Sequence, residues 1–110
     1  MRVVIAMILT WGVLAVQPLA AAGDVQAGKT VYDSKCKLCH GADGKGNPVL
    51  AKSLKVTFPD FTSPDILKGK SDEELKKGVA NGYNKMQPVK GLSDKQLDDV
   101  IGFVHSLAKS

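Results

Sequence analysis

The sequence predicts a single all-α domain with three main helices and one short helix. Apolar and small residues between positions 24 and 37 recur at steps of three and four, which is the spacing of one helix face. Residues 71–74 and 93–96 each follow the pattern of a capping box, the signal of a helix N-terminus. We find no segment with the alternating pattern of a strand. A length of 110 residues is typical of one domain.

The apolar run at the N-terminus marks a segment distinct from this domain. Arg2 precedes an apolar stretch over residues 3–16, and three successive alanines then supply the small residues that a signal peptidase recognises. The stretch is shorter than the ~20 apolar residues that span a bilayer. We therefore expect residues 1–22 to be a signal peptide cleaved after Ala22. Residues 23–110 would be exported, to a bacterial periplasm or a similar compartment, without stable membrane insertion.

The composition of the expected mature chain predicts a thin core and a cofactor. Without Arg2 the 15 basic residues become 14 lysines, which exceed the 11 acidic residues by three. The remaining aromatic side chains are Tyr32, Phe58, Phe61, Tyr83 and Phe103. Small domains with so few large side chains often need a cross-link or a cofactor. The two cysteines are too close in sequence to join distant segments, so a cofactor is the more natural supplement.

The first half of the domain predicts one long helix, a loop and a short helix. The helix runs from about residue 24 to 37, and its spaced positions are Val25, Gly28, Tyr32 and Cys36. Residues 41–61 are rich in glycine and proline and show little periodicity, and such a long loop in a compact domain usually wraps something. A short helix is expected to open at Ser63-Pro64, because proline is tolerated in the first helical turn.

The second half predicts two further helices. The Ser71 hydroxyl can accept a hydrogen bond from the Glu74 amide, and the helix that starts there is expected to stop near residues 81–82. Residues 82–91 form another loop. The capping box at 93–96 opens the final helix, whose apolar stripe consists of Leu97, Val100, Ile101, Val104 and Leu107.

Residues 36–40 read C-x-x-C-H, the sequence at which c-type haem is attached. Two thiols three residues apart, those of Cys36 and Cys39, can each form a thioether with a vinyl group on one side of a porphyrin. His40 then lies beneath the iron, and its imidazole nitrogen is a good ligand for haem iron. The motif predicts one covalently bound haem c, with its iron.

Two other kinds of site use the same residue types. C-x-x-C is also the motif of thiol–disulfide exchange, but there it normally starts a helix after a strand, whereas these cysteines follow a helix. A zinc site needs four protein ligands, or three and a water. The mature chain offers only Cys36, Cys39, His40 and His105, and the position of His105 does not match a zinc finger. Haem attachment is therefore the favoured interpretation.

A six-coordinate iron needs a second axial ligand, and the mature chain offers one methionine and one spare histidine. Met86 lies in the loop 82–91, where a thioether can turn towards a cofactor; alternatively it fills a gap in the core, as methionine often does. His105 falls on the last helix, well off its apolar stripe. We expect His105 to be an exposed surface residue.

These features together resemble the class I monohaem c-type cytochromes over nearly all of residues 24–109. Residues 24–36 look like the N-terminal helix of that family, residues 91–107 look like its C-terminal helix, and residues 82–91 resemble its methionine loop. The resemblance implies a cytochrome c fold, in which three main helices and one short helix surround a single covalent haem.

The resemblance also implies roles for individual residues. In the family the first and last helices cross closely, which here would bring together Gly28, Tyr32 and Phe103. Met86 would be the second axial ligand, and the carbonyl of Pro48 would accept a hydrogen bond from the other ring nitrogen of His40. One difference is Gln87, which separates Met86 from the proline that often follows the ligand methionine directly.

We therefore expect a soluble one-electron carrier that works between redox partner proteins, with no nucleic-acid partner. With His40 and Met86 on the iron no position remains for a substrate, which argues against an enzyme. If Met86 does not bind iron, the axial position would be open or labile, and the protein would sense ligands or react with peroxide. Lys37, Lys85 and Lys90 flank the segments expected near the haem, where they either steer an acidic partner or only solvate the surface.

Overall fold

The computed structural model describes residue 12 and residues 23–108, so the expected signal peptide lies outside the described residues apart from Gly12. The described helices are α1 (Val25–Lys35), α2 (Lys37–His40), α3 (Pro48–Leu54), α4 (Asp72–Asn81) and α5 (Asp94–Leu107). Over these residues the only β pairing is an isolated bridge between Tyr83 and Met86. No helix in this part of the chain has the length and apolar character needed to cross a membrane. The predicted all-α class is confirmed.

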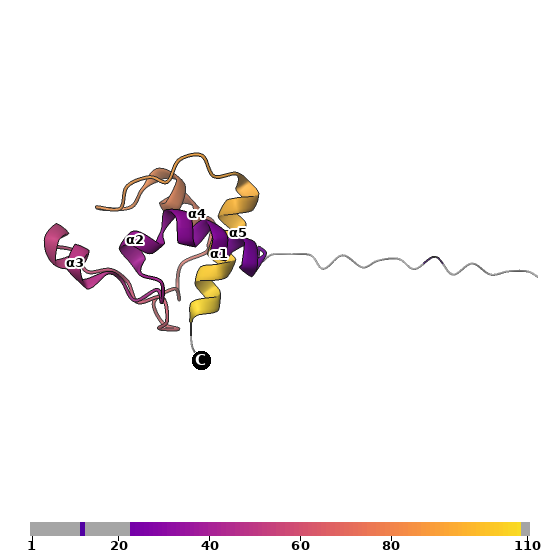
Figure 1. Ribbon diagram of the computed structural model, residues 1–110. Helices are drawn as coiled ribbons and strands as arrows, with labels where there is room; N and C mark the ends of the chain where they lie inside the picture. Colours follow the sequence, from indigo (N-terminus) through magenta and orange to yellow (C-terminus); the bar gives the residue numbers. More distant parts are fainter. Residues whose placement is uncertain (1–11, 13–22, 109–110) are drawn as a thin grey trace, which may run out of the picture.

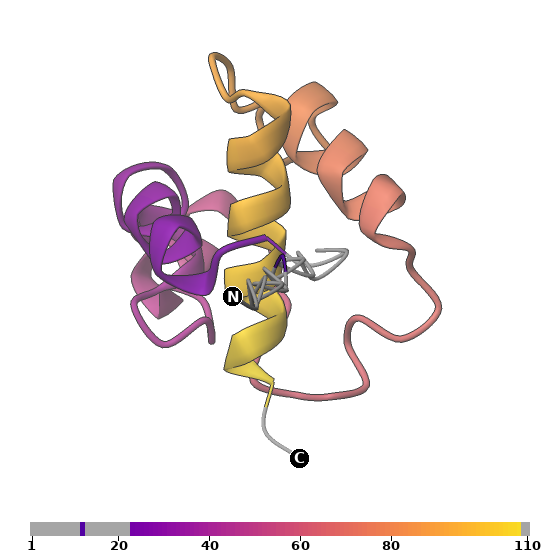
Figure 2. The ribbon, with the colours of Figure 1, turned by 90° about the vertical axis from the view of Figure 1, so that its right-hand side faces the viewer.

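The core lies where α1 and α5 cross. Figure 1 shows α1 passing across α5, and Figure 2 shows α5 standing between α4 on one side and α1 to α3 on the other. The buried hydrophobic side chains come from α1, from the residue that follows it and from α5: Val31, Tyr32, Cys36, Leu97, Val100, Ile101, Phe103 and Val104. Other apolar residues, including Leu75 and Val79 of α4, are only partly buried against this cluster.

The crossing is close because α1 carries no side chain at the point of contact. A β-carbon on Gly28 would lie only 1.9 Å from the Asp99 carbonyl oxygen and 2.9 Å from the Phe103 β-carbon. One turn along α1, the Tyr32 ring packs against the Phe103 ring with 4.9 Å between centroids. The expectation that Gly28, Tyr32 and Phe103 meet at the crossing is confirmed.

Local caps fix the starts of the main helices. The Asp24 carboxylate accepts hydrogen bonds from two amides in the first turn of α1. Both hydrogen bonds of the capping box form at α5, where Ser93 Oγ accepts from the Gln96 amide at 3.1 Å and Gln96 Oε1 accepts from the Ser93 amide at 2.9 Å. At α4 the Ser71 hydroxyl accepts from the Glu74 amide at 3.1 Å, as predicted.

The C-x-x-C-H motif and the segment after it differ from the sequence prediction. The first helix ends at Lys35, because Cys36 has a φ of −118°, far from the helical value, and α2 then begins separately at Lys37. The segment 41–61, expected to be irregular, contains α3. Asn47 opens α3 by accepting hydrogen bonds from two amides of its first turn, and proline follows at the first helical position.

The short helix expected at Ser63-Pro64 is not formed. Residues 61–69 make successive turns instead. Their hydrogen bonds link residues three apart, for example from the Ile66 amide to the Ser63 carbonyl and from the Lys68 amide to the Asp65 carbonyl. The short helical segments in the described part of this domain are therefore α2, which lies within the C-x-x-C-H motif, and α3, which follows it in sequence.

The contact at Gly28 makes a direct prediction about stability. Gly28→Ala should lower the free energy of unfolding by roughly 1–3 kcal/mol, because the new methyl group would force α1 away from α5. Gly78→Ala in α4 is the matched control, since its β-carbon would meet only the Tyr83 β-carbon at 3.8 Å. That change should be neutral or stabilising by up to about 1 kcal/mol. Denaturant unfolding of the two variants checks this, and equal effects would contradict the account of the crossing.

Candidate functional site

The two cysteines lie one turn apart, directly after α1. The Cys36 carbonyl accepts hydrogen bonds from the amides of Cys39 at 3.2 Å and His40 at 2.9 Å, so the whole motif forms a single helical turn. Residues three apart in such a turn lie on the same side, which brings both thiols to one face. Cys36 is buried and Cys39 is half-buried, and no disulfide joins them.

The surroundings of Cys36 do not suit thiol–disulfide exchange. Burial, with a smaller effect from Cys39, raises the pKa of the Cys36 thiol to about 11. A cysteine that attacks disulfides needs a lowered pKa, because the thiolate is the nucleophile. Within residues 12 and 23–108, no three His, Cys, Asp or Glu side chains are grouped so that they could hold a metal ion.

His40 sits against two aromatic rings at the end of α2. The centroid of its ring lies 4.9 Å from that of Phe61 and 5.6 Å from that of Phe58. Burial lowers its pKa, so the ring is held in the neutral form that ligates metals. Its Nδ1 is buried and has no hydrogen-bond partner among the described residues. The contacts with Phe58 and Phe61 are long-range and could not be read from the sequence.

The predicted hydrogen bond between Pro48 and His40 is not formed. The His40 Nδ1 has no partner, and Pro48 is instead the first residue of α3, where a helical carbonyl points towards the amide four residues ahead. The neighbouring Asn47 makes the connection to the motif, because its side-chain amide donates to the Leu38 carbonyl at 3.1 Å. The Gly46 amide donates to the His40 carbonyl at 2.7 Å. Residues 46–47 therefore fasten the backbone of the motif.

Tyr32 links the motif to the helix crossing. Its hydroxyl donates a hydrogen bond to the Gly41 carbonyl at 2.6 Å, just after His40. The side chain is fully buried. Burial, with a smaller electrostatic contribution from Cys36, raises the pKa of Tyr32 to about 12. The residue thus fixes the exit of the chain from the motif, a role that the sequence prediction did not assign to it.

Met86 lies in a separate segment, the loop between α4 and α5. It closes a tight turn, in which the Tyr83 amide donates to the Met86 carbonyl at 3.1 Å and the Met86 amide donates to the Tyr83 carbonyl at 2.8 Å. The Lys70 ammonium lies 4.5 Å from the centroid of the Tyr83 ring. The Val89 amide donates to the Val79 carbonyl at 2.8 Å, which ties the loop to α4. Met86 is half-buried in this turn.

His105 is exposed on α5, as the sequence predicted. Its Nε2 lies 2.7 Å from the Asp72 Oδ1 at the start of α4. The opposite face of α5 buries Val100 and Val104. Turning His105 inward would expose those side chains to water.

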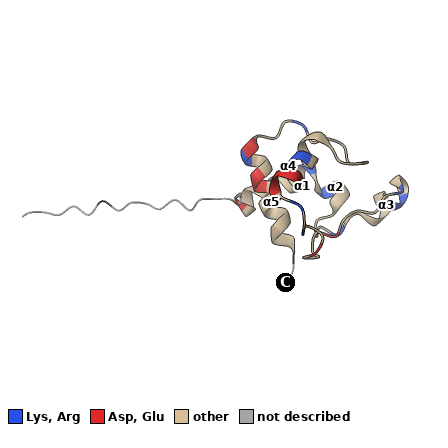
Figure 3. Cartoon of the chain, turned by 180° about the vertical axis from the view of Figure 1, so that it is seen from behind, with Lys and Arg blue, Asp and Glu red and all other residues tan. Residues whose placement is uncertain are grey.

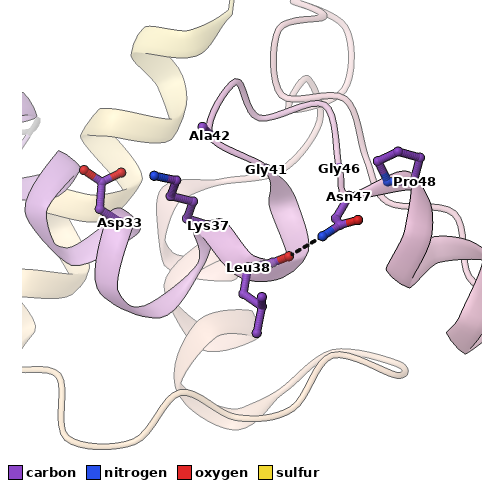
Figure 4. A pocket seen from close by; sticks show the side chains of 8 residues that line it. All are labelled: Asp33, Lys37, Leu38, Gly41, Ala42, Gly46, Asn47 and Pro48. Carbon is purple, nitrogen blue, oxygen red and sulfur yellow. Dashed lines mark hydrogen bonds between the residues drawn. The ribbon is translucent and has the colours of Figure 1, made fainter.

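A shallow depression of about 530 Å³ lies beside the motif (Figure 4). Its lining residues are Asp33, Lys37, Leu38, Gly41, Ala42, Gly46, Asn47 and Pro48. Neither cysteine nor His40 lines it, so it is an outer surface of the motif. The Leu38 side chain is 75% exposed there.

The residues of the motif fit a covalent haem. The two thiols lie one turn apart, and the histidine that follows them is neutral and packs against two aromatic rings. Two thiols on one face and a neutral imidazole next to them are the donor groups that a c-type haem requires.

The chain is similar to a protein family and to several known proteins. The family model described as cytochrome c matches residues 25–108. Cytochrome c-554(547) of Halothiobacillus neapolitanus is 32% identical over 95 residues, covering 78% of this chain and 99% of the relative. The Cbb3-type cytochrome c oxidase subunit CcoP of Azospirillum brasilense is 32% identical over 88 residues, covering 78% of this chain but only 29% of that subunit. Among solved structures, the c-type cytochrome KustC0563 has a TM-score of 0.64 at 26% identity, covering 74% of this chain and 98% of that one.

The buried Tyr32 hydroxyl predicts a pH dependence of stability. In the unfolded chain a tyrosine ionises near its ordinary pKa of 10, whereas Tyr32 in the folded protein ionises near 12. The unfolded state therefore loses its proton first, and stability should fall as the pH rises from 10 to about 12.

Tyr32→Phe should abolish the loss of stability that Tyr32 causes at high pH. It should also lower the free energy of unfolding by about 1–3 kcal/mol at neutral pH, because the Gly41 carbonyl loses its hydrogen-bond donor. Denaturant unfolding at neutral pH and above pH 10 provides the measurement. Tyr83→Phe, at a position that is 57% exposed, is the control. A wild-type-like fall in Tyr32→Phe would contradict the prediction.

Proposed function

Because this chain belongs to the cytochrome c family, we propose that it carries single electrons through a haem c attached to Cys36 and Cys39 and ligated by His40 and Met86. Covalently bound haem c with its iron is the cofactor of this family, and electron transport is its role. The haem supplies the one-electron change between ferrous and ferric iron. The finer assignment of residues rests on the arrangement of the motif.

The observation that carries the proposal is the single turn formed by residues 36–40. It puts two thiols on one face and a neutral imidazole directly after them. The thiols hold the cofactor in place and the imidazole occupies one axial position. The rings of Phe58 and Phe61 exclude water from the imidazole, which contributes to the burial that tunes a haem potential.

Met86 is proposed as the second axial ligand because of its loop position and its chemistry. A thioether is a soft ligand that stabilises ferrous iron and raises the potential relative to a second histidine. The turn that holds Met86 is tied to α4, so the side chain is supplied from a fixed segment on a different part of the fold from His40. Occupation of both axial positions makes the protein a carrier and leaves no place for a substrate.

We place the protein in the bacterial periplasm, on the basis of the N-terminal segment. The proposed signal peptide covers residues 1–22, and covalent haem attachment suits an exported domain formed by residues 23–110. Its partners are redox proteins that donate and accept electrons.

The axial ligand decides between a carrier and a reactive haem protein. Met86→Ala should open the iron, so that the ferrous protein binds carbon monoxide readily, as followed by absorption spectroscopy. Met86→His should give a low-spin haem with a lower potential, within the range of roughly 0.8 V that axial ligands span.

His105→Ala is the matched control and should change neither the spectrum nor the potential, because His105 is exposed and pairs with Asp72. If His105→Ala opens the iron and Met86→Ala does not, the ligand assignment is wrong. If the unmodified protein already binds carbon monoxide readily, the ligand-sensing or peroxidase-like alternative is favoured.

Exposed lysines in the motif and in the loop that carries Met86 offer a docking site for an acidic redox partner. Lys37, Lys85 and Lys90 are exposed, and no ion pair involves them within the described part of the chain. Lys37 adjoins the exposed Leu38, which supplies an apolar contact. Figure 3 shows acidic residues together with lysines on α4 and α5, whereas α3 has basic but no acidic residues. This uneven distribution would orient the motif towards a negatively charged surface.

Docking through these lysines should depend on salt. Replacing Lys37, Lys85 and Lys90 together with glutamine should slow association with an acidic redox partner by roughly tenfold at low ionic strength. The effect should disappear near 1 M salt, where the Debye length is about 3 Å. Stopped-flow electron transfer measures it, with Lys77→Gln on α4 as the control. An association rate that does not change with ionic strength would show that these lysines do not steer the partner.

A further inference from the structure

The residue after the expected cleavage site is seated tightly on α5. A β-carbon on Gly23 would lie 2.3 Å from the carbonyl carbon of Asp98 and 2.3 Å from the amide nitrogen of Asp99. From the other side, a β-carbon on Gly102 would lie 3.0 Å from the Gly23 carbonyl oxygen and 3.3 Å from the Gly23 nitrogen. The backbone of residue 23 therefore passes directly over α5, so close that only glycine fits at this contact.

Negative charge is concentrated around the contact between Gly23 and α5. The Asp99 side chain is buried; its Oδ1 accepts from the Asp24 amide at 2.8 Å and its Oδ2 pairs with Lys95 at 2.8 Å. Asp98 pairs with Lys76 of α4 at 2.7 Å. Three carboxylates, those of Asp24, Asp98 and Asp99, therefore face only two ammonium groups.

A further carboxylate increases this imbalance. Lys76 also pairs with Glu73 at 2.7 Å, so its charge is shared between two acidic groups. The hydrogen bond from Lys95, with a smaller contribution from the Asp24 amide, keeps the pKa of Asp99 below its usual range, so the buried carboxylate stays charged at neutral pH. A buried charge of this kind is stabilised by any additional cation placed beside it.

Resting on the proposed cleavage after Ala22, we propose that an ion pair forms at this contact between the new α-ammonium group of Gly23 and the carboxylate of Asp99. Hydrolysis of the bond between Ala22 and Gly23 consumes one water, leaving a carboxylate on Ala22 and an amine on Gly23 that takes up a proton. The amide of Asp24, one residue further, already binds Asp99. The new ion pair links the start of α1 to α5, so cleavage of the signal peptide stabilises the contact between the two helices.

The ion pair has a defined pH dependence. An α-amino group ordinarily has a pKa of about 7.7–8.0. Asp99, Asp98 and Asp24 favour its charged form, and Lys95 and Lys76 oppose it. The excess of carboxylates raises the pKa in the folded protein. The added stability is therefore fully present below the ordinary pKa and is lost as the pH rises through the raised value.

The test uses the exported haem protein, whose mass should correspond to residues 23–110 plus haem. Selective acetylation of the α-amino group removes its charge and should lower the melting temperature at pH 6 by roughly 4 °C or more. The loss should shrink at high pH, where the free amine is also neutral. An NMR titration should place the α-amino pKa above about 8.

Variants locate the partner of the ammonium group. Asp99→Asn should return the α-amino pKa towards its ordinary value, whereas Asp94→Asn, on the same helix, should not. If Asp99→Asn does not fold, acetylation and NMR titration of the unchanged protein still test whether the α-amino group forms an ion pair. A mature chain that starts elsewhere, an unshifted α-amino pKa, or a melting temperature indifferent to acetylation would each overturn the proposal.

Discussion

The close crossing of α1 and α5 is the constraint on which the rest of this domain depends. Because Gly28 lets the two backbones touch, Tyr32 can reach the core and pack on Phe103. The same tyrosine binds the Gly41 carbonyl, so the crossing also sets the position of the C-x-x-C-H turn. Cys36 follows α1 directly and belongs to the same buried cluster. The site is thus an extension of the core.

The protein core alone covers only part of the domain. Its buried hydrophobic residues belong to α1, α5 and Cys36, whereas apolar residues of α4 and the loops, such as Phe61, Leu75 and Leu92, are partly exposed. Domains of this size bury a smaller fraction of their surface on folding than larger domains do, and they gain much from a ligand that binds the folded state. A covalent haem adds a large apolar group of a size that no side chain of this chain has. Cofactor binding and folding are therefore expected to be coupled.

Sequence reasoning succeeded where structure is decided locally. The capping residues Ser71 and Ser93 gave correct helix starts, because a cap depends only on the next few amides. The helix crossing was predicted from a resemblance and is present. The prediction failed in the glycine- and proline-rich segment 41–61, where α3 was missed, and directly after it, where a helix at Ser63-Pro64 was wrongly expected.

The remaining differences come from long-range contacts. The neighbours of His40 are Phe58 and Phe61, and nothing in the local spacing around the motif marks them. Pro48 was assigned to His40 by analogy, but its place at the start of α3 uses its carbonyl elsewhere. Such contacts depend on how a loop folds back, which the periodicity of a single sequence does not determine.

The central claim is that the turn from Cys36 to His40 holds a covalent haem. Mass spectrometry of the exported protein under denaturing conditions, combined with thiol titration and absorption spectra of both redox states, tests it most directly. The account predicts that the haem mass stays with the chain, that neither thiol reacts, and that the spectra are those of a six-coordinate c-type haem. A chain without haem mass, in which both Cys36 and Cys39 react as thiols, would contradict it.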